Sequence, residues 1–242
     1  MNCKLTIGWL YPKMMNLYGD RGNVIALIYR AKARGIKIIV KDIEIKDYFD
    51  DKAIDLAFFG GGQDKEQSIV SSDLMRKKDN IFRYHEAKKP MLAVCGGYQL
   101  LGNFFQTISG EKIQGIGIFD VNTFGSKNRM VGDIVIRSKY FNNLKLVGFE
   151  NHSGRTFLAN KTDALGIVVR GGGNNGVDNT EGIVINNFIG TYLHGPFLSK
   201  NWEIADWFIE KALEKKYNRS VKLKKINSEL ENKAREYVIR NC

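Results

Sequence analysis

The residues best suited to covalent chemistry are a cysteine and the glycines that follow it. Cys95 ends the apolar run Pro90–Val94, and Gly96 and Gly97 precede a helix-forming sequence. This order is typical of a nucleophile elbow, in which a sharp turn between a strand and a helix exposes the reactive side chain. At Gly97 a side chain would clash in such a turn. We therefore predict that Cys95 is a nucleophile.

The helix after this cysteine favours the same chemistry. Its N-terminal N–H groups and positive dipole end stabilise a thiolate, and the N–H of Gly96 can bind an oxyanion. Ala93 is a departure, because a strict elbow has glycine there. Alanine is the smallest replacement, so an elbow remains compatible with the sequence.

Three histidines are candidates for the base. His194 follows the strand-like run Ile189–Leu193, and a spacing of about 100 residues after the cysteine suits a pair assembled in space. His152, in a polar loop, is the competing candidate. His85 lies in a charged helical stretch without the second histidine of a zinc H-E-x-x-H motif, and we expect it to be exposed.

Two glycine-rich stretches lie in different sequence contexts. Gly61 and Gly62 belong to a run of three glycines after a predicted strand, where backbone N–H groups can approach a substrate and supply a second oxyanion donor. A flexible turn is the alternative. The stretch Gly171–Gly176 fits G-x-G-x-x-G, but no helix comes after it to hold a pyrophosphate, so we expect a hairpin loop. Without a G-x-x-x-x-G-K-[ST] motif, ATP binding by this chain is not expected.

The elements that must position these residues alternate between strands and helices. This alternation predicts an α/β fold with a doubly wound, mostly parallel sheet, whose active site lies at the carboxyl ends of the strands. The expected strands are Lys4–Leu10, Ile36–Ile45, Ile54–Phe59 and Pro90–Val94, and the expected helices are Val24–Ala33 and Ser68–Lys89.

The second half is predicted to be rich in β-structure and to end in two helices. Because neither an internal repeat nor a low-complexity linker occurs, we expect one domain over residues 1–242. The expected strands are Ile116–Val121, Met130–Ile136, Val147–Phe149, Gly166–Arg170 and Gly182–Phe188, and the expected helices are Glu203–Tyr217 and Ser228–Arg240.

Composition excludes several classes of protein. No apolar run reaches the length of a membrane helix and the start lacks a secretory signal, so we expect a cytoplasmic protein. Three sparse cysteines form neither a disulfide framework nor a zinc pattern. The net charge of +11 invites a nucleic-acid interpretation, but the basic residues are scattered and no aromatic-interleaved motif occurs. An acidic partner or an anionic substrate is favoured instead.

Five blocks together resemble class I, triad-type glutamine amidotransferases of the cobyric-acid-synthase-like (CobB/CobQ) branch. Within that branch they are most similar to the GatD-type glutaminase subunits of lipid II isoglutaminyl synthases. The blocks are Asn16–Asn23, Gly60–Gln67, Cys95–Leu101, Phe149–Thr156 and Tyr192–Asn201.

The resemblance implies a subunit that hydrolyses L-glutamine to glutamate and ammonia. It implies a heterodimer with a Mur-ligase-like partner, MurT, which uses ATP and the ammonia to amidate the D-glutamate α-carboxyl of lipid II to D-isoglutamine in peptidoglycan biosynthesis. No cofactor, metal or nucleic acid is implied. Membrane contact is implied only indirectly, through the partner's lipid-linked substrate.

Carried over residue by residue, the resemblance makes Cys95 the nucleophile and His194 the base. Arg129 matches the arginine of the glutamine site, and a guanidinium can fork onto the substrate α-carboxylate. Composition alone would make it a surface arginine. Gln99, on the elbow helix, is expected to face the substrate.

One departure concerns the acid that orients the base. Most triad amidotransferases have His-x-Glu, but here Pro196 stands two residues after His194. Either a Cys–His dyad operates, its tautomer set by a backbone carbonyl or water, or an acid from elsewhere substitutes. Asp20 and Glu150 are the candidates.

Three alternative functions remain open at this stage. One is an amidotransferase subunit of the same branch that serves another synthetase. A second is a stand-alone cysteine hydrolase acting on γ-glutamyl compounds. The third is a basic binding module with a vestigial site, which would bind nucleic acid in a salt-sensitive manner.

Overall fold

The computed structural model describes residues 3–242. Its first sheet has the strand order β11-β12-β4-β3-β1-β2. All neighbours are parallel except β11, which pairs antiparallel with β12. The predicted α/β fold with a mostly parallel sheet is therefore confirmed. The strands are β1 (Lys4–Leu10), β2 (Lys37–Ile43), β3 (Leu56–Phe59), β4 (Met91–Val94), β11 (Ile183–Ile185) and β12 (Phe188–Thr191).

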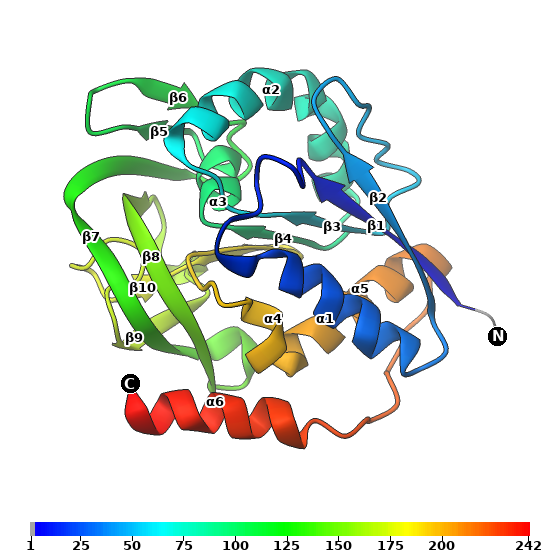
Figure 1. Ribbon diagram of the computed structural model, residues 1–242. Coiled ribbons are helices and arrows are strands. Elements are labelled where there is room, and N and C mark those ends of the chain that lie inside the picture. Colours follow the sequence, from blue (N-terminus) through cyan, green and yellow to red (C-terminus); the bar gives the residue numbers. More distant parts are fainter. Residues whose placement is uncertain (1–2) are drawn as a thin grey trace.

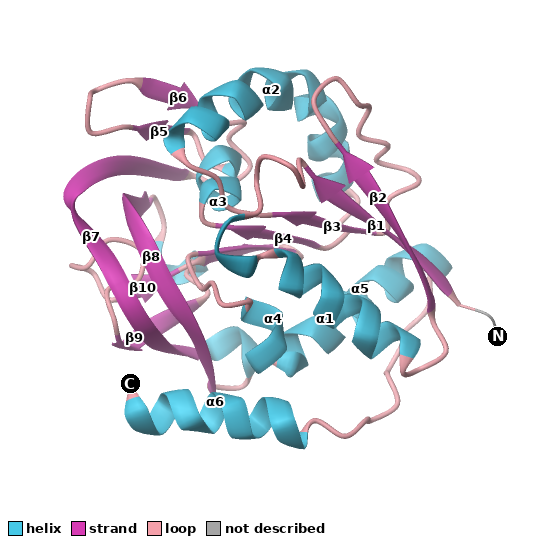
Figure 2. Cartoon of the chain, in the orientation of Figure 1, coloured by secondary structure: helices cyan, strands magenta, loops and turns pink. Residues whose placement is uncertain are grey.

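Helices cover both faces of this sheet (Figure 2). Helices α2 and α3 lie on one face, and α1, α4 and α5 lie on the other. No helix within residues 3–242 is both long and apolar enough to cross a membrane. The helices are α1 (Arg21–Lys32), α2 (Asp64–Glu86), α3 (Gly96–Leu101), α4 (Phe197–Lys200), α5 (Trp202–Tyr217) and α6 (Glu229–Asn241), with short 3₁₀ turns at Leu17–Gly19, Lys139–Phe141 and Lys161–Asp163.

The second sheet has the order β10-β9-β7-β5-β6, with β8 paired to β7. Strands β7 and β8 form a long antiparallel hairpin beside the parallel sheet (Figure 1). The sequence pattern predicted only short pieces of this hairpin. The strands are β5 (Phe104–Gln106), β6 (Lys112–Gln114), β7 (Val121–Ser138), β8 (Leu144–Leu158), β9 (Gly166–Arg170) and β10 (Thr180–Glu181).

One predicted strand is absent. The segment 116–120 is irregular, and only Val121 belongs to a strand. The N–H groups of Ile116 and Phe119 donate to the carbonyls of Leu100 and Leu101 at the end of α3. The segment therefore packs along a helix end, and its backbone hydrogen bonds are satisfied there rather than in a sheet.

The central strands bring the chemically interesting segments together at one edge. Strands β3, β4 and β12 are buried along their whole lengths, as expected for parallel strands covered on both faces. Phe59 is in register with Ala93, and Val94 with Thr191. Because these strands are parallel, the segments that follow them begin at the same edge of the sheet.

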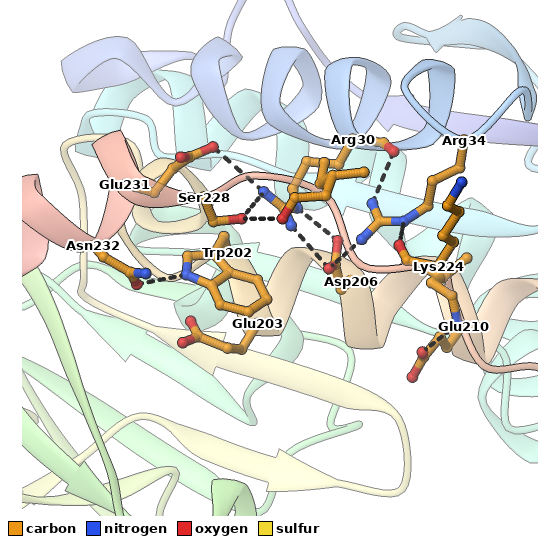
Figure 3. A network of polar contacts seen from close by, with 12 residues as sticks. Arg30, Arg34, Trp202, Glu203, Asp206, Glu210, Lys224, Ser228, Glu231 and Asn232 are labelled. Carbon is orange, nitrogen blue, oxygen red and sulfur yellow. Dashed lines mark hydrogen bonds and ion pairs between the residues drawn. The ribbon is translucent and has the colours of Figure 1, made fainter.

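A buried arginine ties α1 to the C-terminal part of the chain (Figure 3). Arg30 is 2% exposed and forms a two-pronged ion pair with Asp206 of α5, at 2.6 and 2.9 Å. Its remaining nitrogen donates to Ser228 and pairs with Glu231 at the start of α6. Arg34 contacts the same aspartate at 2.6 Å. This network supports the face of the sheet opposite α2.

We expect Arg30→Met to lower the free energy of unfolding by about 3 kcal/mol, because it leaves a buried carboxylate with fewer partners. Urea unfolding followed by circular dichroism measures the change. Lys233→Met is the matched control, since Lys233 and Glu229 form a pair that is mostly exposed. Its effect is expected to stay below about 1 kcal/mol. Equal effects of the two substitutions would contradict a structural role for the Arg30 network.

Candidate active site

The turn after β4 has the backbone geometry of a nucleophile elbow. Cys95 has φ 51° and ψ −107°, a conformation that costs free energy for a residue with a side chain. Its N–H donates to the Thr191 carbonyl at 2.9 Å. The Gly97 N–H donates to the Gly60 carbonyl at 3.1 Å. These bonds hold the strained residue between strand and helix.

Close backbone contacts require glycine at the two positions that follow Cys95. A Cβ atom at Gly97 would lie 2.6 Å from the Phe59 carbonyl oxygen, and one at Gly96 would lie 2.9 Å from the Gly62 nitrogen. Ala93, the departure from a strict elbow, is fully buried within β4. The turn therefore forms without a glycine at that position.

An acid lies behind His194. Its Nδ1 is 3.0 Å from Oδ1 of Asp20, and both side chains are fully buried. The other carboxylate oxygen accepts the Gly61 N–H at 2.8 Å. A Cβ atom at Gly61 would lie 3.2 Å from His194 Cε1 and 3.3 Å from Cys95 Cβ. The Cys95 side chain, the His194 imidazole and the Asp20 carboxylate thus meet around one glycine.

The electrostatics of this cluster favour a protonated imidazole. Burial lowers the pKa of His194, but Cys95 and Asp20 raise it more, to about 10. An Nδ1–H bonded to Asp20 leaves Nε2 as the nitrogen available for proton transfer, and Nε2 has no hydrogen-bond partner among residues 3–242. His194 can therefore hold a proton at neutral pH and deliver it to a leaving group.

His152 lies in the wall of the cavity onto which Cys95 opens, and it is held differently from His194. Its ring stacks on Tyr192, with centroids 3.6 Å apart, and its Nδ1 is 2.9 Å from the Gly154 carbonyl. Burial lowers the pKa of His152 to about 3, so the ring is neutral at physiological pH. The third histidine, His85, is half-buried against Phe188 rather than exposed as expected.

The two glycines of the first glycine-rich loop have different surroundings. Because the Gly61 N–H is bonded to Asp20, it is not free to bind a substrate oxygen. The N–H groups of Gly62 and Gly96 donate to no other group in the described part of the chain. The side chain of Gln67 donates to the Gly62 carbonyl at 3.1 Å and fixes that peptide. The available pair of oxyanion donors is therefore Gly62 and Gly96.

Cys95 opens onto a polar cavity of about 400 Å³, a size that suits a small ligand. Residues 3–242 contain no cluster of three or more metal-binding side chains. The lining comes from the loop before α1, the segment that leads into α2 and the start of that helix, the elbow turn and helix α3, strand β5 and the β7–β8 hairpin. It comprises Leu17, Tyr18, Gly62, Gln63, Asp64, Lys65, Gln67, Cys95, Gln99, Phe105, Arg129, Asn151, His152, Ser153 and Gly154.

Arg129 reaches this cavity from an irregularity in β7, where the register shifts between Gly125 and Met130. Its guanidinium donates to the Tyr18 hydroxyl and the Asn151 carbonyl, both at 2.9 Å. Nη1 makes no bond within residues 3–242. The structure thus places a cation at the cavity whose Nη1, with its two N–H donors, is unbonded among the described residues.

Gln99 lines the cavity from the elbow helix. Its Nε2 donates to the Tyr192 hydroxyl at 2.9 Å. The carbonyl oxygen Oε1 has no partner among the described residues. An acceptor is therefore available on the elbow side of the site.

Glu150, the other candidate for the acid that orients His194, does not bond to that histidine. Its carboxylate oxygens accept the N–H groups of Gly172 and Gly173, at 2.8 and 2.9 Å. Burial raises its pKa. The second glycine-rich loop therefore uses its N–H groups to hold a carboxylate of the chain itself, which fits a structural loop.

Several residues of the cavity wall were not predicted from the sequence. Tyr18 packs edge-on against His194, with ring centroids 5.0 Å apart, and holds a positive φ of 50°. Asn151 and Ser153 lie on the hairpin beside His152. In the sequence, these residues are marked only by their polar surroundings and by their place in the blocks Asn16–Asn23 and Phe149–Thr156, which resemble the amidotransferases.

Comparisons with known proteins agree with this geometry. The chain matches the CobB/CobQ-like glutamine amidotransferase domain over residues 6–202. It is 43% identical over 221 residues to the lipid II isoglutaminyl synthase (glutamine-hydrolyzing) subunit GatD of Streptococcus pneumoniae (strain ATCC BAA-255 / R6), which covers 91% of this chain and 85% of that protein. It is also 43% identical over 236 residues to the GatD subunit of Staphylococcus aureus (strain N315), which covers 98% and 95%.

A crystal structure of a glutamine amidotransferase shares the fold, with a TM-score of 0.55 at 13% identity over 85% of this chain and 98% of that one. The family match and the two relatives confirm the resemblance inferred from the residue blocks. The chain belongs to the CobB/CobQ-like glutamine amidotransferase family.

Proposed function

We propose that this chain is the glutaminase subunit of a lipid II isoglutaminyl synthase, with Cys95 as nucleophile, His194 as acid and base, and Asp20 as the acid that orients it. The observation that carries the proposal is the meeting of these three side chains around Gly61. A triad, with its acid taken from the loop before α1, is therefore preferred over a dyad.

The reaction proceeds through a thioester. The Cys95 thiolate attacks the side-chain carbonyl carbon of L-glutamine, and the Gly62 and Gly96 N–H groups stabilise the oxyanion that forms. His194 gives its proton to the departing nitrogen, which leaves as ammonia. The neutral imidazole then takes a proton from water, whose oxygen attacks the thioester and releases glutamate and the thiolate.

The substrate is held by two groups at the cavity. The Arg129 guanidinium binds the α-carboxylate of glutamine through Nη1, the nitrogen that bonds to neither Tyr18 nor Asn151. The Gln99 carbonyl accepts from an N–H of the substrate, because its amide nitrogen is already bonded to Tyr192.

The recipient of the ammonia is a second subunit. The relatives are named as glutamine-hydrolyzing subunits of a synthase, which supports a chain that works beside a synthetase. We assign that role to a Mur-ligase-like partner, MurT, in a cytoplasmic heterodimer that amidates the D-glutamate α-carboxyl of lipid II. The test is ammonia release from glutamine, and amidation of lipid II, with and without this partner. Full amidation supported by another synthetase but not by MurT would refute the assignment.

Substitution of the nucleophile and of each nearby histidine tests the reacting groups. Cys95→Ala is expected to abolish ammonia release, because no other thiol lies at the elbow. His194→Ala is expected to lower kcat by roughly 100-fold or more, through loss of proton transfer. His152→Ala is expected to retain more activity than His194→Ala, since the neutral His152 ring is stacked on Tyr192 and bonded to the Gly154 carbonyl rather than to a carboxylate. A fully active Cys95→Ala, or a reversed order of the two histidines, would refute the assignment.

The orienting acid is tested by an isosteric change. Asp20→Asn is expected to lower kcat by roughly 100-fold or more, because the imidazole loses its preferred tautomer. Removing the carboxylate also lowers the pKa of His194, so its proton is lost at a lower pH and the alkaline limb of the kcat profile moves to lower pH. Glu150→Gln, which changes the other candidate acid, is expected to leave that profile in place. The opposite outcome would make Glu150 the orienting acid.

The substrate clamp is tested by the balance between KM and kcat. Arg129→Ala is expected to raise KM for glutamine by roughly 10-fold or more, with a smaller change in kcat, because the α-carboxylate lies far from the reacting bond. Lys127→Ala, which removes a nearby exposed cation, is expected to leave KM unchanged. Equal changes in KM for both variants would show only a general effect of positive charge.

A further inference from the structure

We propose that Glu181 is a positioning residue that fixes the segment Thr191–Leu193, and through it the separation between Cys95 and His194. The inference rests on the proposed glutaminase function. It concerns a carboxylate that takes no part in the mechanism above and that lies on β10, in the second sheet.

Two hydrogen bonds attach this carboxylate to the end of β12. One oxygen, Oε1, accepts the Thr191 hydroxyl at 2.7 Å and the Tyr192 N–H at 2.8 Å. The Thr191 oxygen in turn accepts the Leu193 N–H at 3.1 Å. Bonds to a carboxylate are stronger than those to a neutral acceptor, so this short segment is held at its first two residues.

The held segment contacts Cys95, Gln99 and His152. The Thr191 carbonyl accepts the N–H of the strained Cys95 at 2.9 Å. The Tyr192 hydroxyl accepts from Gln99, and its ring stacks on His152. His194 follows directly in the chain. A shift of this segment would therefore displace the nucleophile, the base and the substrate-contacting glutamine together.

The burial of the Glu181 carboxylate is by itself unfavourable for stability. Glu181 is fully buried, its Oε2 has no partner among residues 3–242, and no cation of that range pairs with it. Burial, with a smaller contribution from the charge of Glu150, raises the pKa of Glu181 to about 7, although the hydrogen bonds from Thr191 and Tyr192 lower it. The charge of Glu181 also contributes to raising the pKa of the Tyr98 and Tyr192 hydroxyls. A buried carboxylate without a countercharge costs free energy, so its contribution lies in the geometry that it imposes.

Three variants separate this role from simple stability. Glu181→Ala removes the acceptor, Glu181→Gln keeps an acceptor of the same shape, and Thr191→Val removes only the hydroxyl. Ser138→Ala is the matched control, because it deletes another buried hydroxyl, bonded to the Leu165 carbonyl in the second sheet. Each variant is assayed with the partner subunit for kcat and KM. The alkylation rate of Cys95 by iodoacetamide is followed by peptide mass spectrometry, since Cys3 and Cys242 are also free thiols.

We expect Glu181→Ala to lower kcat by roughly 10-fold or more, since small misplacements of reacting groups are costly, while KM changes less. Alkylation of Cys95 should slow in parallel. Glu181→Gln should restore most of both rates, Thr191→Val should fall between Glu181→Ala and Glu181→Gln, and Ser138→Ala should match the wild type.

Wild-type kcat and alkylation rates in a folded Glu181→Ala variant would overturn the proposal. If that variant does not fold, wild-type rates in Thr191→Val would overturn it. A wild-type protein that releases no ammonia would refute the proposed function. The alkylation comparison would then still decide whether Glu181 positions the cysteine.

Discussion

The site depends on one buried hydrogen bond, between His194 and Asp20, which joins residues 174 positions apart in the sequence. Neither side chain is exposed to solvent. A buried carboxylate needs partners, and this one has the imidazole on one oxygen and the Gly61 N–H on the other. The same carboxylate therefore fixes the His194 imidazole and anchors the glycine loop beside Cys95.

This arrangement explains the distribution of small residues and strain. The cysteine adopts an unfavourable backbone conformation, and close backbone contacts exclude side chains at Gly96 and Gly97. Bonding the Gly61 N–H to the acid leaves the N–H of Gly62 for an oxyanion. The strained cysteine, the tightly packed glycines and the buried carboxylate thus all lie at the edge of the sheet where β3, β4 and β12 end.

Some features of this site could be predicted from the sequence because they depend on local patterns. An apolar run ending in a cysteine and two glycines predicts an elbow, and a strand ending in His194 predicts a second group at the same edge. Which of Asp20 and Glu150 bonds to His194 could not be predicted, because it depends on how loops fold across the sheet. The β7–β8 hairpin was predicted only in pieces, since the irregularity before Met130 interrupts the alternation of strand residues.

The proposed mechanism requires that glutamine is hydrolysed through a thioester on Cys95. Rapid acid quenching of the protein and its partner during turnover with L-glutamine, combined with peptide mass spectrometry, tests this step directly. We predict a γ-glutamyl adduct on the peptide that contains Cys95. Turnover with no adduct on that peptide, or with an adduct on Cys3 or Cys242 instead, would contradict the mechanism.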